Sequence, residues 1–137
     1  MRVQGGSENN FGVHKFGNRL YFYVTSKVGD NTQTRRVGFE GPDTAALIKA
    51  GRWHHVAATW DGPANDVRLY LDGRMTATLS NDPVGVTLNL GPAATFTVGA
   101  DTNLTTPADA VIDQFRIHDV ALSPEAIARA ARGLEQE

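Results

Sequence analysis

Apolar and polar residues alternate along most of this chain, and that period of two constrains its fold more than any other feature. In the segment 66–72, Val67, Leu69 and Leu71 fall on one side of an extended chain, whereas Tyr70 and its charged neighbours fall on the other. Alternation of this kind between turn residues is typical of strands that bury one face against a core. The pattern therefore predicts antiparallel β-structure.

Turn residues separate the alternating segments at short intervals. Asp72-Gly73 is a typical tight hairpin turn, and Gly17-Asn18 is a second candidate. The expected strands are 11–16, 20–25, 34–40, 56–60, 66–72, 75–80, 86–90, 95–100 and 110–118. About nine short strands at this spacing favour an all-β fold, a two-sheet antiparallel jelly-roll sandwich.

A single segment has helical character. Ser123 suits the N-cap, Pro124 suits the first helical position, and the alanine-rich run 126–131 has high helix propensity. Its apolar face is thin, so we expect one short C-terminal helix on the surface of the sandwich. Because no repeat or linker divides the chain, residues 1–137 are predicted to form one domain.

Composition excludes several classes of protein. The chain has 13 basic and 15 acidic residues and no cysteine, so neither a disulfide framework nor a cysteine zinc site is available. The basic residues are spread along the chain, which argues against nucleic acid as a partner. No apolar run approaches the roughly 20 residues of a membrane span. The N-terminal segment 1–6 also lacks the apolar stretch of a secretory signal.

Three ordered segments resemble a known family. They read GRWHHVAATWDG at 51–62, VRLYLDG at 67–73, and VIDQFRI at 111–117 followed by LSPEAI at 122–127. Together they resemble the laminin G-like and pentraxin-like domains of the concanavalin A-like lectin/glucanase superfamily. The resemblance implies a jelly roll and, as in most relatives, an extracellular or cell-surface location, although the chain itself shows no signal.

The resemblance also implies that strands are missing at the start of the domain. Relatives usually open with further strands, one of which pairs beside the closing strands, whereas segment 5–24 is similar to the family's middle portion. The deficit amounts to about two or three strands of ordinary length. We expect a second copy of the chain to cover the exposed sheet edges, giving a homo-oligomer such as a dimer. The alternative is a fragment of a longer natural chain.

Pentraxin-like relatives bind calcium, and the resemblance carries a candidate ligand set to this chain. The matching metal ligands are Glu8, Asn9, Asn10, Asp101 and Asn103. Their oxygen atoms suit one Ca²⁺, which takes six to eight hard ligands. Only two of the five side chains are charged, and the alternative is that these Asn and Asp residues simply initiate turns.

Aromatic residues provide the other candidates for binding. Tyr21, Tyr23 and Tyr70 occupy the polar faces of their strands and are predicted to form a shallow ligand surface, although tyrosine is also ordinary on exposed strands. Trp53 and Trp60 are expected to pack in the core, with stacking on a sugar as the alternative, and Trp53, which opens its strand, is the one that partial exposure would suit. The predicted partner is a glycan or a protein surface, without nucleic acid and without membrane insertion.

Catalytic residues are not expected. Asp113 shares the register of Val111 and Phe115, so it is predicted to face the core and to accept hydrogen bonds there. His54 and His55 are adjacent on a strand and face opposite sides, so they cannot both reach one metal. The chain has neither a nucleophile elbow nor an array of paired carboxylates for glycoside hydrolysis.

These features predict a non-catalytic binding module that recognises glycan or protein surfaces, with or without calcium. A structural, self-assembling accessory sandwich is the alternative from another class. A remnant glycoside hydrolase is a more remote one. All three share the same predicted fold, because one sandwich can host unrelated functions through its loops.

Overall fold

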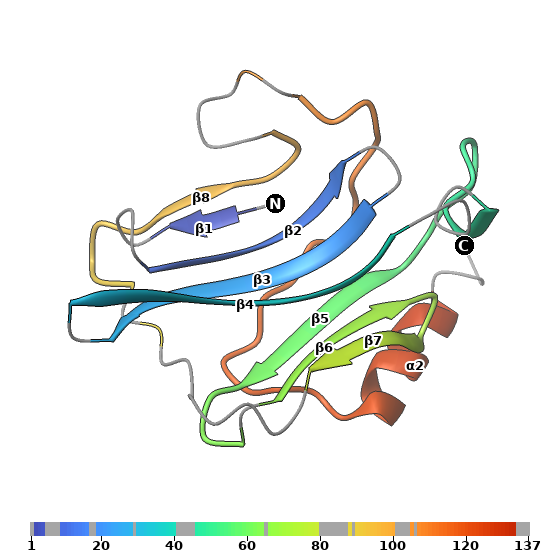
Figure 1. Cartoon of the computed structure of the whole chain (residues 1–137). Helices are drawn as coiled ribbons and strands as arrows, with labels where there is room; N and C mark the ends of the chain where they lie inside the picture. Colours follow the sequence, from blue (N-terminus) through green and yellow to red (C-terminus); the bar gives the residue numbers. More distant parts are fainter. Residues whose placement is uncertain are drawn as a thin grey trace.

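Two antiparallel sheets of unequal width face each other in the computed structural model of the chain (Figure 1). The structure describes residues 2–4, 9–16, 19–28, 30–40, 46–64, 66–79, 88, 90–100, 105 and 107–133. The wider sheet, in the order β4-β3-β2-β1-β8, contains β1 (Arg2–Gln4), β2 (Asn10–Phe16), β3 (Arg19–Val28), β4 (Asn31–Glu40) and β8 (Thr95–Thr97). The narrower sheet, in sequence order, contains β5 (Val56–Asp61), β6 (Asp66–Leu71) and β7 (Arg74–Leu79). This arrangement confirms the predicted two-sheet antiparallel sandwich.

Strands β2 to β7 form where the alternation predicts them. β8 ends at Thr97, earlier than the predicted segment 95–100. β1 was not predicted, because three residues are too few to show a period. The predicted strand 86–90 lies largely outside the described residues.

The turn between β6 and β7 explains why the sequence places Asp72-Gly73 there. Asp72 has φ 50° and Gly73 has φ 75°, so both central residues adopt the left-handed conformation. A two-residue hairpin turn whose twist matches the flanking strands requires this conformation at both positions. Aspartate tolerates it better than most residues, and glycine adopts it without steric cost. The predicted hairpin is therefore confirmed.

The hydrophobic core lies between the two sheets. Its buried side chains come from both sheets and are Phe11, Leu20, Phe22, Val24, Val37, Val67 and Leu69. The indole of Trp60 packs against this cluster, with its ring centroid 4.7 Å from that of Phe11. Trp60 thus packs as predicted, whereas Trp53 is 62% exposed and the core prediction for it is wrong. Trp53 precedes β5 in an irregular segment, where no sheet face directs it inward.

The helix α2 (Pro124–Gly133) lies beside β7 of the narrower sheet (Figure 1). Ser123 Oγ accepts the backbone N–H of Ala126 at 3.2 Å, which confirms the predicted N-cap. Ile127 and Ala131 are its buried residues. A Cβ on Gly73 would lie 3.0 Å from the Cβ of Ala131, so the helix closely approaches the β6–β7 turn.

The predicted strand over 110–118 does not form. Residues 107–121 are all exposed, and in Figure 1 this part of the chain runs as an irregular segment toward α2. In the part of the chain that the structure describes, no strand pairs with it. Alternation sets which side chains share a face, but a strand also needs a neighbour to bond its backbone N–H and C=O groups.

The absence of this strand also changes the surroundings of Asp113. The prediction that its carboxylate faces the core is wrong, because Asp113 is exposed on the irregular segment. Its Oδ1 accepts the backbone N–H of Gln114 at 2.7 Å, so it does accept a local backbone hydrogen bond. Gln114 itself has φ 51°, a left-handed conformation that interrupts the extended chain.

Candidate binding surface

The face of the wider sheet turned away from the core gathers aromatic and basic side chains. In the β2–β3 pairing His14 lies opposite Tyr21, and in the β3–β4 pairing Tyr23 lies opposite Arg36. Tyr21 and Tyr23 alternate along β3 with the core residue Phe22 and share the face opposite to it. His14, Tyr21, Tyr23 and Arg36 therefore lie together, and we call this set the Tyr21 face.

Close ring contacts hold the Tyr21 face together. The His14 ring centroid lies 5.6 Å from that of Tyr21 and 5.2 Å from that of Tyr23, in an edge-on arrangement in the second case. The two tyrosine rings are 6.2 Å apart. The Arg36 guanidinium lies over the Tyr21 ring, 5.1 Å from its centroid, as in a cation–π contact. Three rings and one cation thus form a single cluster on one sheet face.

Exposure differs among the three predicted ligand-binding tyrosines. Tyr21 is half-buried and keeps part of its ring accessible. Tyr23 is only 9% exposed, because His14 and Tyr21 pack against it, so its predicted exposure is wrong. His14 and Arg36, which the sequence analysis did not single out as ligand-binding residues, join Tyr21 instead. The signal that could have found them was their register across β2, β3 and β4.

Tyr70 does not belong to this surface. It lies on β6 of the narrower sheet and is 1% exposed, so the prediction that it is an accessible ligand-binding residue is wrong. Tyr70 occupies the face of β6 opposite to the core residue Leu69. Alternation correctly separates the two faces of the strand but does not show whether the second face is exposed.

The predicted calcium ligands are only partly within the described residues. Glu8, Asp101 and Asn103 lie outside them. Asn9 is half-buried, and Asn10 is a 4% exposed residue at the start of β2, between β1 and β3 in the sheet. Across the described ranges no group of three or more His, Asp or Glu residues is placed to hold a metal ion. The calcium site therefore stays a prediction.

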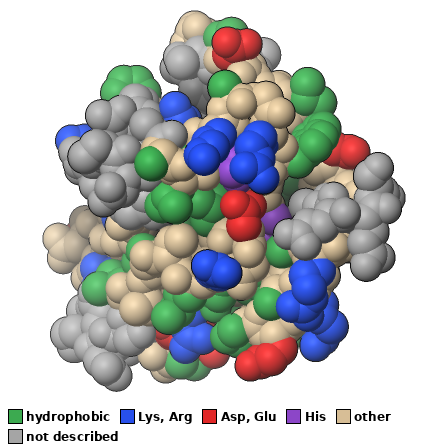
Figure 2. All heavy atoms as spheres, turned by 90° about the vertical axis from the view of Figure 1, so that its right-hand side faces the viewer, with side chains coloured by type: hydrophobic (Ala, Val, Ile, Leu, Met, Phe, Trp, Pro, Cys, Tyr) green, Lys and Arg blue, Asp and Glu red, His purple; other side chains and the backbone are tan. Residues whose placement is uncertain are grey.

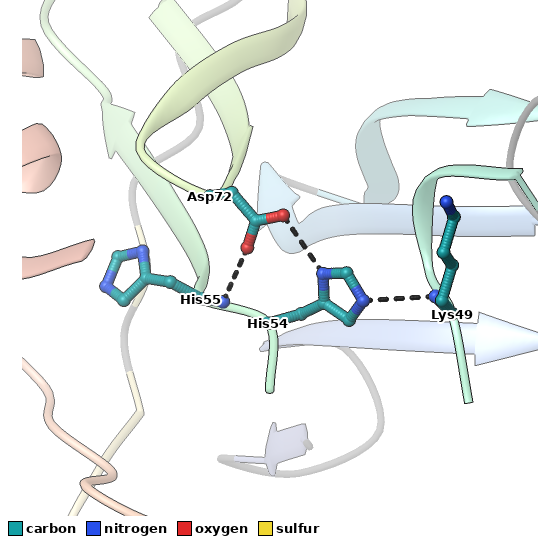
Figure 3. A network of polar contacts seen from close by, with 4 residues as sticks. All are labelled: Lys49, His54, His55 and Asp72. Carbon is teal, nitrogen blue, oxygen red and sulfur yellow. Dashed lines mark hydrogen bonds and ion pairs between the residues drawn. The ribbon is translucent and has the colours of Figure 1, made fainter. Parts of the chain in front are cut away.

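A polar network joins the segment before β5 to the β6–β7 turn (Figure 3). His54 Nε2 accepts the backbone N–H of Lys49 at 3.0 Å, so the imidazole proton is on Nδ1, which donates to Asp72 Oδ2 at 2.9 Å. Asp72 Oδ1 accepts the backbone N–H of His55 at 2.9 Å, and the Asp72 N–H donates to the His55 carbonyl at 2.8 Å. Both imidazole nitrogens of His54 are thus occupied, and the network fixes the loop to the turn.

His55 points away from this network, as Figure 3 shows. The side chains of His54 and His55 therefore do not converge on one site. The sequence analysis predicted this, because adjacent residues of an extended chain face opposite sides. Nδ1 of His55 is buried, and no hydrogen-bond partner for it occurs among the described residues. Burial lowers the pKa of the His55 imidazole, although the nearby Asp72 carboxylate raises it.

Charges of both signs are mixed on the surface seen in Figure 2. Basic side chains there lie among hydrophobic and acidic ones rather than in one basic field. This matches the small formal charge of −2 of the whole chain. In the described part of the chain, no helix has the length and apolar character needed to cross a membrane.

Comparisons with known proteins agree with the sandwich architecture. The family model described as the Concanavalin A-like lectin/glucanases superfamily matches residues 1–128. Among solved structures, the chain is similar to an S-layer domain-containing protein from Clostridium thermocellum, with a TM-score of 0.53 and 23% sequence identity. That similarity covers 93% of this chain and 58% of the other, so the chain spans little more than half the length of its structural neighbour. No curated relative matches the sequence.

Proposed function

The chain belongs to the concanavalin A-like lectin/glucanase superfamily, and from that premise we propose that it is a non-catalytic binding module that recognises carbohydrate through the Tyr21 face. The observation that carries the proposal is the contact of Tyr21 with both His14 and Arg36 on one sheet face. Fold alone does not assign a ligand, so the argument rests on the chemistry of these side chains.

The chemistry of the Tyr21 face suits a sugar ring. A tyrosine presents an apolar ring face and a polar hydroxyl, and the C–H-rich face of a pyranose can pack on the former. Arg36 is exposed and offers several N–H donors in a planar fork, and His14 adds a ring nitrogen. Binding is expected to be weak per site and to be strengthened by several copies.

The described carboxylates of the narrower sheet favour a non-catalytic role. Asp66 pairs with Arg68. Asp61 accepts the backbone N–H of Ala64 at 3.1 Å, and Asp72 belongs to the histidine network. Each of these acids thus has a structural partner, whereas glycoside hydrolysis needs two carboxyl groups facing one cleft.

A glycan array followed by calorimetry with the best oligosaccharide tests the proposal. Tyr21→Ala and Arg36→Ala are expected to remove binding while circular dichroism shows an unchanged fold. The matched control is Arg74→Ala, an exposed arginine on β7 of the other sheet, which is expected to bind like the wild type. A folded protein without saturable binding to any glycan would contradict the proposal, as would equal loss of binding in the Arg74 control.

Calcium and location form a separate part of the proposal and rest on the family resemblance. One Ca²⁺ ligated by the candidate set around Glu8 and Asp101 would be detected by calorimetric titration with CaCl₂, with Asp101→Ala as the variant. Identical glycan binding in CaCl₂ and in EGTA would exclude a calcium-assisted mechanism. We also propose an extracellular or cell-surface location, which antibody labelling of intact cells tests.

A further inference from the structure

The segment 111–120 exposes an unusual amount of apolar surface. Its large hydrophobic side chains, with exposures between 40% and 77%, are Val111, Ile112, Phe115, Ile117 and Val120. Contiguous exposed apolar residues mark interaction sites in soluble proteins. This segment is therefore a candidate contact with another chain.

One side of the segment is anchored to the molecule, and the rest faces solvent. The Phe115 ring lies 5.0 Å from that of Phe96 on β8, and the Ile112 Cδ1 atom lies 3.8 Å from the place of a Cβ on Gly99. These contacts hold the segment in place beside the wider sheet. Ile117 is 53% exposed, so the segment carries accessible apolar surface beyond these anchors.

The same segment has the pattern of a strand without the pairing of one. Its residues alternate as those of β6 do, yet no strand in the described part of the chain bonds to it. Gln114, with φ 51°, adopts a conformation unfavourable for a residue with a side chain. A neighbouring strand would return it to an extended conformation and bond the backbone N–H and C=O groups of the segment in a regular ladder.

The sequence of the segment is complementary to itself in antiparallel orientation. A two-fold axis at the centre of 111–118 places Ile112 opposite Ile117 of the partner subunit and Asp113 opposite Arg116 of the partner subunit. Opposite residues of an antiparallel pair share a face, so these two kinds of pair make favourable contacts, and the axis repeats each of them. The same register places Val111 opposite His118 of the partner subunit and Gln114 opposite Phe115 of the partner subunit. A shift by one residue in either direction would place Asp113 opposite an apolar residue.

We propose that this chain forms a two-fold symmetric homodimer in which residues 111–118 of the two copies pair as antiparallel strands. The pairing is isologous, so it closes at two copies. It brings Ile112 against Ile117 of the partner subunit twice and adds two Asp113–Arg116 ion pairs between subunits. The dimer stands independently of carbohydrate binding, because none of its residues belongs to the Tyr21 face.

Light scattering after size-exclusion chromatography provides the first test. The expected mass is twice the chain mass of 14.8 kDa, across the micromolar range. On raising the concentration, amide hydrogen exchange at 111–118 is expected to slow. A monomer at all concentrations overturns the proposal, and so does a dimer whose protected amides lie elsewhere.

Charge reversal provides the second test. Asp113→Arg and Arg116→Asp each place like charges opposite one another, and both variants are expected to be monomers. An equimolar mixture of the two restores both opposite-charge pairs, so it is expected to form heterodimers, which no effect within one chain can produce. Asp109→Arg, an exposed acid outside the paired residues, is the matched control and is expected to remain a dimer. A dimer that survives the single reversals, or a mixture that stays monomeric, overturns the proposed register.

Discussion

Segments 66–72 and 111–117 both carry apolar residues at alternate positions, interrupted in the second by Asp113, yet only the first contains a strand. β6 lies between β5 and β7 and bonds to both. In the described residues, the second segment has no such neighbour, and all of its residues are exposed.

The difference shows that alternation and pairing are separate requirements. Alternation gives a segment one apolar face, which a core can bury. Pairing satisfies its backbone, and that depends on what lies beside it in space. In β6 both alternation and pairing occur within one chain, whereas the 111–118 segment gains its pairing in the proposed dimer.

The largest expected effect contrasts a core residue of β6 with an exposed residue of the unpaired segment. Leu69 is fully buried, so Leu69→Ala is expected to lower the free energy of unfolding by about 3 kcal/mol through lost burial and the remaining cavity. Val111 is 77% exposed, and Val111→Ala is expected to change it by less than about 0.5 kcal/mol at concentrations where the chain is monomeric. Urea denaturation measures both. Similar losses for the two variants would contradict the comparison.

The next effect contrasts two left-handed residues, Asp72 in the hairpin turn and Gln114 in the irregular segment. Asp72→Ala removes the bonds to His54 and His55 and strains the turn, so it is expected to lower the free energy of unfolding by about 2 kcal/mol. Gln114→Gly relieves strain without losing a core contact and is expected to leave the monomer's stability unchanged or slightly higher.

Urea denaturation measures the free energy of unfolding of both variants, and Asp72→Asn is the matched control for Asp72→Ala. Asparagine tolerates the left-handed conformation and can still accept the His55 N–H, so its loss is expected to be smaller than that of alanine. Equal losses for the asparagine and alanine variants would show that the side-chain bonds of Asp72 do not stabilise the turn.

A smaller effect concerns the helix α2, which lies beside β7 and approaches the β6–β7 turn. Ser123→Ala removes the N-cap of α2 and is expected to lower the free energy of unfolding by about 1 kcal/mol. Ser123→Asp restores an acceptor at the same position and is expected to recover most of the loss. Thermal unfolding followed by circular dichroism measures both, and an aspartate variant no more stable than the alanine variant would exclude the capping role.

The smallest effect concerns His55. Because burial lowers the His55 pKa below 6.5, the unfolded chain binds a proton more readily than the folded one as the pH falls through that value. The free energy of unfolding is therefore expected to decrease from pH 7.5 toward pH 5.5. His55→Gln is expected to reduce that slope in pH-dependent urea denaturation. An unchanged slope would show that other groups dominate the pH dependence.

Much of the fold could be predicted, because most strands pair with a neighbour close in sequence. The β6–β7 hairpin is an example: the Asp72-Gly73 turn and the alternation on both sides specify it locally. The N-cap of α2 is similarly local, since Ser123 acts within three residues. Such features need no knowledge of the rest of the molecule.

The candidate site could be predicted only in part, because contacts from distant segments shape it. Tyr21 was identified by its strand face, but the register that brings His14 and Arg36 to it spans three strands. Tyr70 was misassigned because the alternation along β6 distinguishes the two faces of the strand but does not show that the second face is also buried. Three of the five calcium candidates lie outside the described residues, so that prediction is untested.

The close approach of α2 to the β6–β7 turn also affects the order in which this protein can assemble. During synthesis, the hairpin leaves the ribosome well before residues 124–133 follow, because the chain is made from its N-terminus. Until the helix docks, Gly73 lacks the neighbouring residues Ala128 and Ala131. The nascent sandwich therefore passes through a stage in which the β6–β7 turn is formed but open to solvent, and docking of the helix ends that stage.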